Sequence, residues 1–174
     1  AANGPIALCE VQAYVYRAKR AAADVARALG DIDHADRLVK EAESLRERFE
    51  RAFWCERLGS YALALDGKGR PCCVRTSNAG HCLYAGIAGQ DRGSRTARAL
   101  LREDMFSGWG IRTLATSEAR YNPMSYHNGS VWPHDNAMIA AGMAAYGYKE
   151  GAIKILTGLF DASLFLDLHR MPEL

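Results

Sequence analysis

Apolar side chains recur at alternating spacings of three and four residues along the N-terminal third of the chain. The first series is Leu8, Val11, Val15, Ala18, Ala22, Val25 and Leu29. The second series is Ala35, Leu38, Ala42, Leu45, Phe49 and Ala52. This spacing places each series on one face of an α-helix. The short link at residues 30–33 predicts that the two helices are antiparallel neighbours.

The pattern changes after the second helix. Residues 61–74 alternate and then turn at Asp66-Gly67-Lys68-Gly69, which predicts a short β-hairpin or an extended loop. Four further helices are predicted at residues 77–89, 91–105, 131–147 and 149–168. The first and third of these carry almost no charge, whereas the second and fourth are amphipathic. We therefore predict an all-α fold of antiparallel helical hairpins, with the two uncharged helices in an inner, more buried layer.

Size and charge exclude several classes of protein. A chain of 174 residues suits one domain or a piece of a larger one. The net charge of +2 gives no strong electrostatic capture of nucleic acid. No apolar run approaches the roughly 20 residues that cross a membrane. The first residues also lack the basic region and apolar core of a signal peptide.

The five cysteines are an odd number, which favours free thiols in a reducing, cytoplasmic protein over a secreted disulfide framework. Cys72-Cys73 and the nearby His81-Cys82 lack the paired C-x-x-C spacing of a zinc site. We therefore expect no metal and no other cofactor, and interpret these thiols as small buried apolar groups.

One segment, residues 107–136, has the composition of a binding site. It combines two of the three tryptophans and two of the five histidines with Asn, Tyr, Arg and Asp. Aromatic rings stack on the C–H faces of sugars, while amides and charged groups bind hydroxyls. The alternative is an ordinary long loop whose aromatic residues plug the helix ends. The candidate substrate-binding residues in this segment are Trp109, Arg112, Tyr126, His127, Asn128, Trp132, His134 and Asp135.

Three stretches of the sequence carry a resemblance to a known family. They are residues 4–12 (GPIALCEVQ), residues 106–113 (FSGWGIRT) and the run from Tyr121 to Asn136 (YNPMSYHNGSVWPHDN), and the closing RMPEL is also similar. In collinear order they resemble the amylo-α-1,6-glucosidase, or bacterial glycogen-debranching, family. The resemblance implies an (α/α)6 toroid of six helical hairpins, shared with trehalases and glucoamylases. Because twelve helices make that ring, we expect residues 1–174 to form about half of such a catalytic domain.

An inverting glycosidase needs two carboxyl groups roughly 6.5–9.5 Å apart, one acting as acid and one as base. Asp135 falls in the first turn of a predicted helix, where the dipole favours the anion, so it suits a sugar hydroxyl or Arg112 better than acid catalysis. Glu118 is expected to face solvent. Glu10 is interpreted either as a substrate contact or as a hydrogen-bonded structural residue. Glu173 near the chain end has the position of a frayed tail.

The resemblance implies that Glu173 corresponds to the general base of the family. It also implies that the general acid is an Asp just upstream of Gly4, where this sequence has none. We therefore expect a glycoside hydrolase that acts on α-glucosidic bonds and is inactive as an isolated chain. The expected partners are an α-glucan or glucoside, the remainder of the catalytic domain and, because half a ring leaves apolar faces open, a second copy.

Two alternatives stay open at this stage. Some relatives of the toroid are phosphorylases, which use phosphate in place of an activated water molecule. A helical-pair scaffold that binds peptides without catalysis is the third possibility, and it does not require the clustered aromatic and polar segment.

Overall fold

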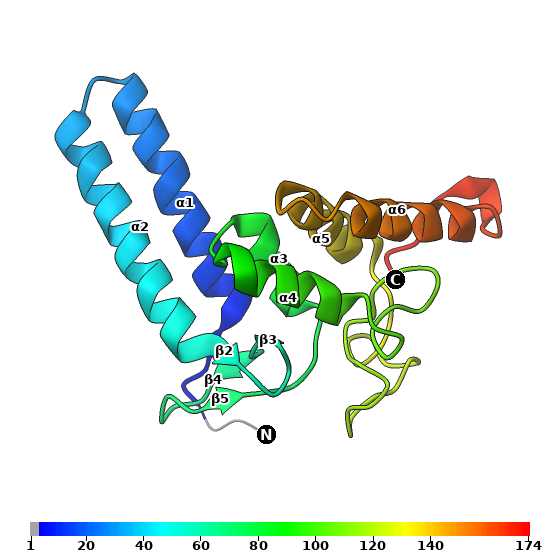
Figure 1. Ribbon diagram of the computed structural model, residues 1–174. Helices are drawn as coiled ribbons and strands as arrows, with labels where there is room; N and C mark the ends of the chain where they lie inside the picture. The colour runs from blue at the N-terminus through cyan, green and yellow to red at the C-terminus, as the bar shows by residue number, and fades with distance from the viewer. Residues whose placement is uncertain (1–3) are drawn as a thin grey trace.

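The computed structural model describes residues 4–174 and is mostly helical (Figure 1). Its helices are α1 (Cys9–Ala28), α2 (Ile32–Phe53), α3 (Asn78–Ala85), α4 (Gln90–Leu100), α5 (Pro133–Ala145), α6 (Lys149–Ser163) and the 3-10 helix η1 (Asp167–His169). Its two-residue strands are β1 (Ala7–Leu8), β2 (Trp54–Cys55), β3 (Ser60–Tyr61), β4 (Ala64–Leu65) and β5 (Pro71–Cys72). The prediction about a signal peptide concerns, in part, residues 1–3, which lie outside the described residues.

The first two helices form the predicted antiparallel hairpin, which projects from the rest of the molecule (Figure 1). The Asp31 side chain caps α2 by accepting a hydrogen bond of 3.0 Å from the His34 N–H. The buried face of α1 is made of small residues and one tyrosine: Cys9, Ala13, Tyr16, Ala23 and Ala26. The longer apolar series that predicted this helix, from Leu8 through Val25 to Leu29, lies on the exposed side.

Helices α3 and α5 approach each other closely at two glycines. A Cβ atom at Gly142 would lie 2.5 Å from the backbone nitrogen of Tyr84, and one at Gly80 would lie 2.5 Å from Cγ1 of Ile139. Hydrogen in place of a side chain therefore lets the two backbones meet. The fully buried Leu83, Ile139 and Met143 fill the surrounding core.

The predicted layering is confirmed for α3, of which nearly every residue is buried. It is wrong for α5, which is buried on one side only and is no more covered than α4. The exposed side of α5 consists of small apolar residues, among them Ala137, Ala141 and Ala144. Helix α6 exposes larger ones, including Ile153, Leu156 and Phe160.

A partly buried carboxylate joins the hairpin to β3 and to the start of α4. Glu50 on α2 accepts hydrogen bonds from the Tyr61 hydroxyl at 2.7 Å, the Gly89 N–H at 2.6 Å and Arg92 at 2.6 Å. Burial, followed by the bond to Glu50, raises the pKa of Tyr61 well above its usual value.

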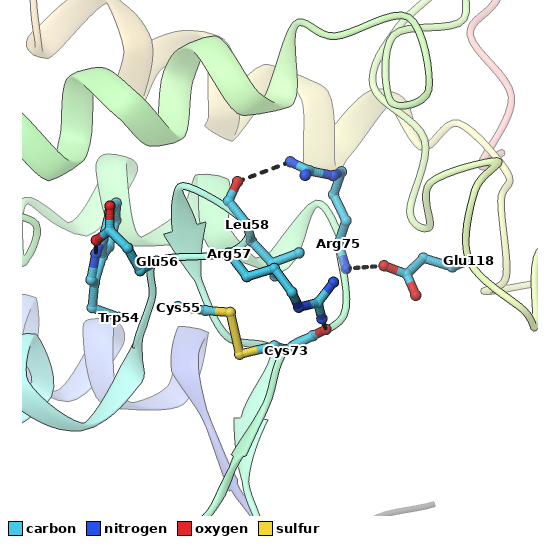
Figure 2. Close-up of a disulfide and its surroundings, with 8 residues drawn as sticks. All are labelled: Trp54, Cys55, Glu56, Arg57, Leu58, Cys73, Arg75 and Glu118. Atoms are coloured by element: carbon cyan, nitrogen blue, oxygen red, sulfur yellow. Dashed lines mark hydrogen bonds between the residues drawn. A yellow bond between two sulfur atoms is a disulfide. The ribbon is translucent and has the colours of Figure 1, made fainter.

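The predicted hairpin at residues 61–74 is confirmed, since β4 pairs with β5 in an antiparallel sheet that β1 completes. Figure 2 shows the disulfide between Cys55 and Cys73, beside which Arg57 donates a hydrogen bond of 2.7 Å to the Cys73 carbonyl. The expectation of five free thiols is therefore wrong for these two cysteines, while Cys9, Cys72 and Cys82 are free. Because two cysteines form a disulfide, free thiols no longer support the predicted reducing, cytoplasmic setting. Within residues 4–174, every helix is too short or too polar to cross a membrane.

Candidate active site

The polar and aromatic segment after α4 is fixed to the start of α5 by one buried amide. Asn136, which is fully buried, accepts a hydrogen bond of 2.6 Å from the Ile111 N–H through Oδ1. Its Nδ2 donates to the carbonyls of Ile111 and Trp132, both at 3.0 Å. A Cβ atom at Gly110 would lie 2.9 Å from Oδ1 of Asn136, so only glycine leaves room for this arrangement. The bonds set the positions of Trp132 and of the first turn of α5.

A cleft of about 1200 Å³ lies between this segment, α1, α3 and the β4–β5 hairpin. Its volume exceeds the usual range of small-molecule sites, which suits an open groove more than a closed pocket. Six of the candidate residues from the sequence line it: Glu10, His127, Asn128, Trp132, His134 and Asp135. The segment thus meets the N-terminal end of α1, more than a hundred residues earlier in the chain.

An aromatic cluster forms the rim of the cleft. The His127 and Trp132 rings are stacked with centroids 5.5 Å apart, and Tyr126 meets each of them edge to face at 4.5 and 4.8 Å. The Trp132 indole N–H is satisfied internally, by the Tyr126 carbonyl at 3.1 Å and the Ser130 hydroxyl at 3.0 Å. These bonds orient the indole and leave its ring available to stack on a ligand.

Glu173 is joined to this cluster. The Tyr126 hydroxyl donates a hydrogen bond of 2.5 Å to Oε1 of Glu173, and this bond raises the pKa of Tyr126. Although Glu173 is exposed, its carboxylate is bonded to Tyr126, whose ring packs against the cleft-lining His127 and Trp132. The C-terminal segment therefore contacts the aromatic cluster through Glu173, whereas Met171, Pro172 and Leu174 line a separate apolar cavity.

Three helices meet at a chain of hydrogen bonds inside the cleft. Asp135, in the first turn of α5, bonds through Oδ1 to Nε2 of His81 on α3. Nδ1 of the same imidazole lies 2.5 Å from the Tyr14 hydroxyl of α1. Burial, and then the nearby Glu10 carboxylate, raise the pKa of Tyr14 to about 12, so that hydroxyl keeps its proton at neutral pH. The second carboxylate oxygen of Asp135, Oδ2, is buried and has no hydrogen-bond partner within the described residues.

Four candidate residues do not line the cleft: Tyr126 and Glu173, which are hydrogen-bonded to each other beside its rim, and Trp109 and Arg112. Trp109 packs edge to face on Phe165, with ring centroids 5.8 Å apart, and lines a separate apolar cavity of about 270 Å³. Arg112 pairs with Val131 in an isolated β-bridge, and its Nη1 is buried without a partner in residues 4–174. Within residues 4–174, Arg112 and Asp135 form no hydrogen bond with each other.

Sequence reasoning did not assign several polar residues of the cleft to the site, among them Tyr14, His81 and Glu118. Tyr14 follows Glu10 by one helical turn and so shares its face, a signal that the sequence contained. His81 had been considered only beside Cys82, as part of a possible zinc site. Glu118 does not simply face solvent, because it lines the cleft and accepts a hydrogen bond of 2.8 Å from the Arg75 N–H (Figure 2).

The described part of the chain contains no group of three or more His, Cys, Asp or Glu residues placed to hold a metal ion. The side chains that line the cleft offer hydrogen bonding, aromatic stacking and carboxylate acid–base groups.

Comparison with known proteins agrees with this architecture. The profile of the mannosylglycerate hydrolase MGH1-like glycoside hydrolase domain matches residues 3–164. No curated protein matches the chain in sequence.

Solved structures show the same fold. An uncharacterized conserved protein from Thermus thermophilus superposes with a TM-score of 0.76 and 25% identity over 93% of this chain and 39% of its own. The GH63 mannosylglycerate hydrolase of that organism, in complex with Tris and D-glycerate, has a TM-score of 0.76 and 25% identity over 93% and 38%. Neutral trehalase from Saccharomyces cerevisiae has a TM-score of 0.78 and 14% identity over 95% and 33%. The chain thus has the fold of part of a six-hairpin glycosidase toroid and spans well under half of these relatives.

Proposed function

We propose that this chain, which belongs to the mannosylglycerate hydrolase MGH1-like glycoside hydrolase family, supplies the general base and one sugar-binding wall of an inverting glycosidase. The observation that carries the proposal is the junction of Glu173 with the aromatic rim through Tyr126. It brings a carboxylate from the end of the chain to a tyrosine that packs against His127 and Trp132, two residues of the large polar and aromatic cleft. Neither the helices nor the loop alone would favour hydrolysis over ligand binding.

In this proposal each side of the cleft has its own role. Glu173 is the base that takes a proton from the attacking water, with Tyr126 orienting its carboxylate. Trp132 and His127 offer stacked rings to one face of the sugar. Asp135 and Glu10 accept hydrogen bonds from its hydroxyls, and the polar lining is completed by Asn128 and His134.

The general acid is not among these residues. The resemblance places it on an Asp just before Gly4, and residues 1–3 are Ala, Ala and Asn. We propose that it comes from outside the 174 residues, as part of the remainder of a six-hairpin domain. A leaving alkoxide that receives no proton departs slowly, because acid catalysis typically contributes ~10²–10⁴ in rate. This chain alone should therefore be almost inactive on ordinary glycosides.

The first candidate substrate contains an α-glucosidic bond, such as the α-1,6 branch of a glucan, as the sequence resemblance implies. A second candidate is a small α-mannoside, and the match to a family named for mannosylglycerate hydrolase favours it. Both candidates place an α-linked hexose against the same wall and differ in what occupies the rest of the groove.

The proposal is tested directly by substrates whose leaving group departs without acid catalysis. Fluoride leaves without full protonation, so we expect the chain to hydrolyse α-glucosyl fluoride or α-mannosyl fluoride slowly, with the β-hexose as first product by NMR. Glu173→Gln should abolish this activity, because the amide cannot act as a base, while hexose affinity changes little. The matched control is Glu47→Gln, an exposed position on α2 away from the cleft.

The relative rates on the two fluorides decide between the glucoside and mannoside forms. Hydrolysis that persists in Glu173→Gln at the wild-type rate would assign the base to another residue. Release of the α-hexose would exclude single-step inversion.

A further inference from the structure

Asn128 lines the cleft and is followed in the sequence by Gly129. Asparagine is a thermolabile residue, and it reacts most readily before glycine, because no side chain obstructs the glycine nitrogen when it attacks the asparagine amide. The fold requires the glycine here. Its φ is +142°, and a Cβ atom at this position would lie 2.4 Å from the Tyr121 ring. The structure therefore keeps a chemically labile pair of residues in a wall of the cleft.

Both polar groups of the peptide unit between these two residues are hydrogen-bonded. The Asn128 carbonyl accepts a bond of 2.7 Å from the Asn122 N–H, and the N–H of the buried Gly129 donates a bond of 2.9 Å to Oγ1 of Thr113. Thr113 is itself held in place, because its N–H donates to the Ser130 carbonyl at 2.9 Å. Two bonds, one on each side, therefore fix the plane of this peptide.

The reaction open to this pair is loss of ammonia from the asparagine. The Gly129 N–H loses its proton to solvent and the nitrogen turns toward Cγ of Asn128. A bond forms between this nitrogen and Cγ, the bond from Cγ to Nδ2 breaks, and the amide nitrogen takes up a proton and leaves as ammonia. Water, the only co-reactant, then opens the cyclic imide at either carbonyl and gives aspartate or isoaspartate. Because the nitrogen must turn, the peptide plane rotates and both of its hydrogen bonds break.

We propose that Asn128 is a self-modification site, and that the hydrogen bond from Gly129 to Thr113 holds its reaction back in the folded protein. Local opening of residues 121–130 releases the peptide and permits the reaction. The product places a negative charge in the wall of the cleft and, in isoaspartate, one additional main-chain atom beside His127, whose ring stacks on Trp132. A transient opening is thereby converted into a permanent change of the site. The reaction needs no ligand, so it is independent of the substrate of the cleft.

Incubation of the folded and the unfolded chain tests the protection directly. The protein is kept at neutral pH in ¹⁸O-labelled water, with or without concentrated urea, and conversion of Asn128 is followed by mass spectrometry of its peptides. We expect conversion in urea and a rate at least about tenfold lower in the folded protein, since two hydrogen bonds oppose the reaction. The second Asn-Gly pair of the sequence, Asn3-Gly4, is the internal standard for the unfolded chain.

The role of Thr113 has its own variants. Thr113→Val has nearly the same shape but lacks the acceptor oxygen, so it should accelerate the reaction of Asn128 in the folded protein by a few fold to about tenfold. Thr113→Ser, which keeps a hydroxyl, should retain most of the protection. Thr116→Val, at an exposed threonine of the same segment, is the matched control. Hydrogen exchange of the Gly129 N–H should accelerate in Thr113→Val while that of the Leu83 N–H does not, which separates local release from global unfolding.

Each outcome bears on one part of the proposal. Isoaspartate among the products supports the imide route, and aspartate alone would overturn it. Equal rates for Asn128 in the folded and the unfolded chain would overturn the protection by the fold. A wild-type rate in Thr113→Val would overturn the role of Thr113. The comparison of folded with unfolded wild type needs no variant, so it decides even where Thr113→Val does not fold.

Discussion

The α3–α5 pair and the outer side of α1 are both apolar, yet only the first has partners within the described residues. Leu83 on α3 is 1% exposed and packs among Ile139 and Met143, while Val25 on α1 is 59% exposed and Leu29 is 81% exposed. In sequence both regions are rich in apolar residues, which recur at helical spacing on one face of α1 and occur almost without charged residues in α3 and α5. The difference teaches that periodicity identifies which residues share a face, and that the surroundings decide whether this face is covered.

The largest contrast should appear when equivalent atoms are removed from the two regions. Leu83→Ala should lower the free energy of unfolding by about 3 kcal/mol, since it removes buried methyl groups and leaves a cavity. Leu29→Ala, the same change on the exposed side, should stay within ~0.5 kcal/mol. Urea denaturation of both variants measures the difference. Similar losses for both would mean that the outer side of α1 is covered in solution.

The second largest loss of stability is expected for a substitution at Asn136, a buried polar residue. Asn136→Ala removes the amide that satisfies the Ile111 N–H and carbonyl, so two buried backbone groups lose their partners. We expect a loss of about 2 kcal/mol in the free energy of unfolding, together with weaker binding of glucose, because the segment that carries Trp132 is released. Asn128→Ala, in the exposed part of the same segment, should affect binding with little effect on stability.

At alkaline pH the free energy of unfolding should fall because of a buried residue, Tyr61. The pKa of Tyr61 is raised from 10.0 in the folded protein, so above pH 10 the unfolded chain releases this proton while the folded chain keeps it. The stabilisation is therefore complete below pH 10 and declines as pH rises, by at most ~1.4 kcal/mol per pH unit. Urea titrations at increasing pH test this slope, and Tyr61→Phe should flatten it.

The smallest effect on stability should come from the outer side of α1. Val15→Ser with Val25→Ser should change the free energy of unfolding by less than ~0.5 kcal/mol. If this side binds a second copy, as the sequence suggested, sedimentation velocity should show a shift from dimer to monomer at matched concentration. A wild-type protein that is monomeric at all concentrations would contradict that expectation.

Much of the fold could be predicted from local signals. The first hairpin followed from helical spacing and a glycine link, and the all-α class followed from the alternation of uncharged and amphipathic segments. The one-sided burial of α5 could not be predicted, because an alanine-rich helix has no polar face to indicate what lies beside it. The pairing of Cys55 with Cys73 depends on a turn that brings distant residues together, and spacing in sequence does not report it.

The candidate site was predictable where its residues are contiguous. Five residues of one short stretch of sequence line the cleft together, as predicted: His127, Asn128, Trp132, His134 and Asp135. Trp109 belongs to that stretch in sequence but turns toward Phe165. Tyr14 and His81 reach the site from other helices, so only the tertiary packing of α1 and α3 against α5 reveals them.

The disulfide between Cys55 and Cys73 has a practical consequence for every measurement above. Protein made in a reducing bacterial host and protein made in an oxidising one would differ by a covalent ring, closed over a separation of 18 residues. In a chain-entropy view such a ring stabilises the folded state by about 3 kcal/mol, as much as the largest substitution effect expected here. Preparations should therefore be matched by thiol titration before variants are compared, because a batch with mixed oxidation would imitate a mutation.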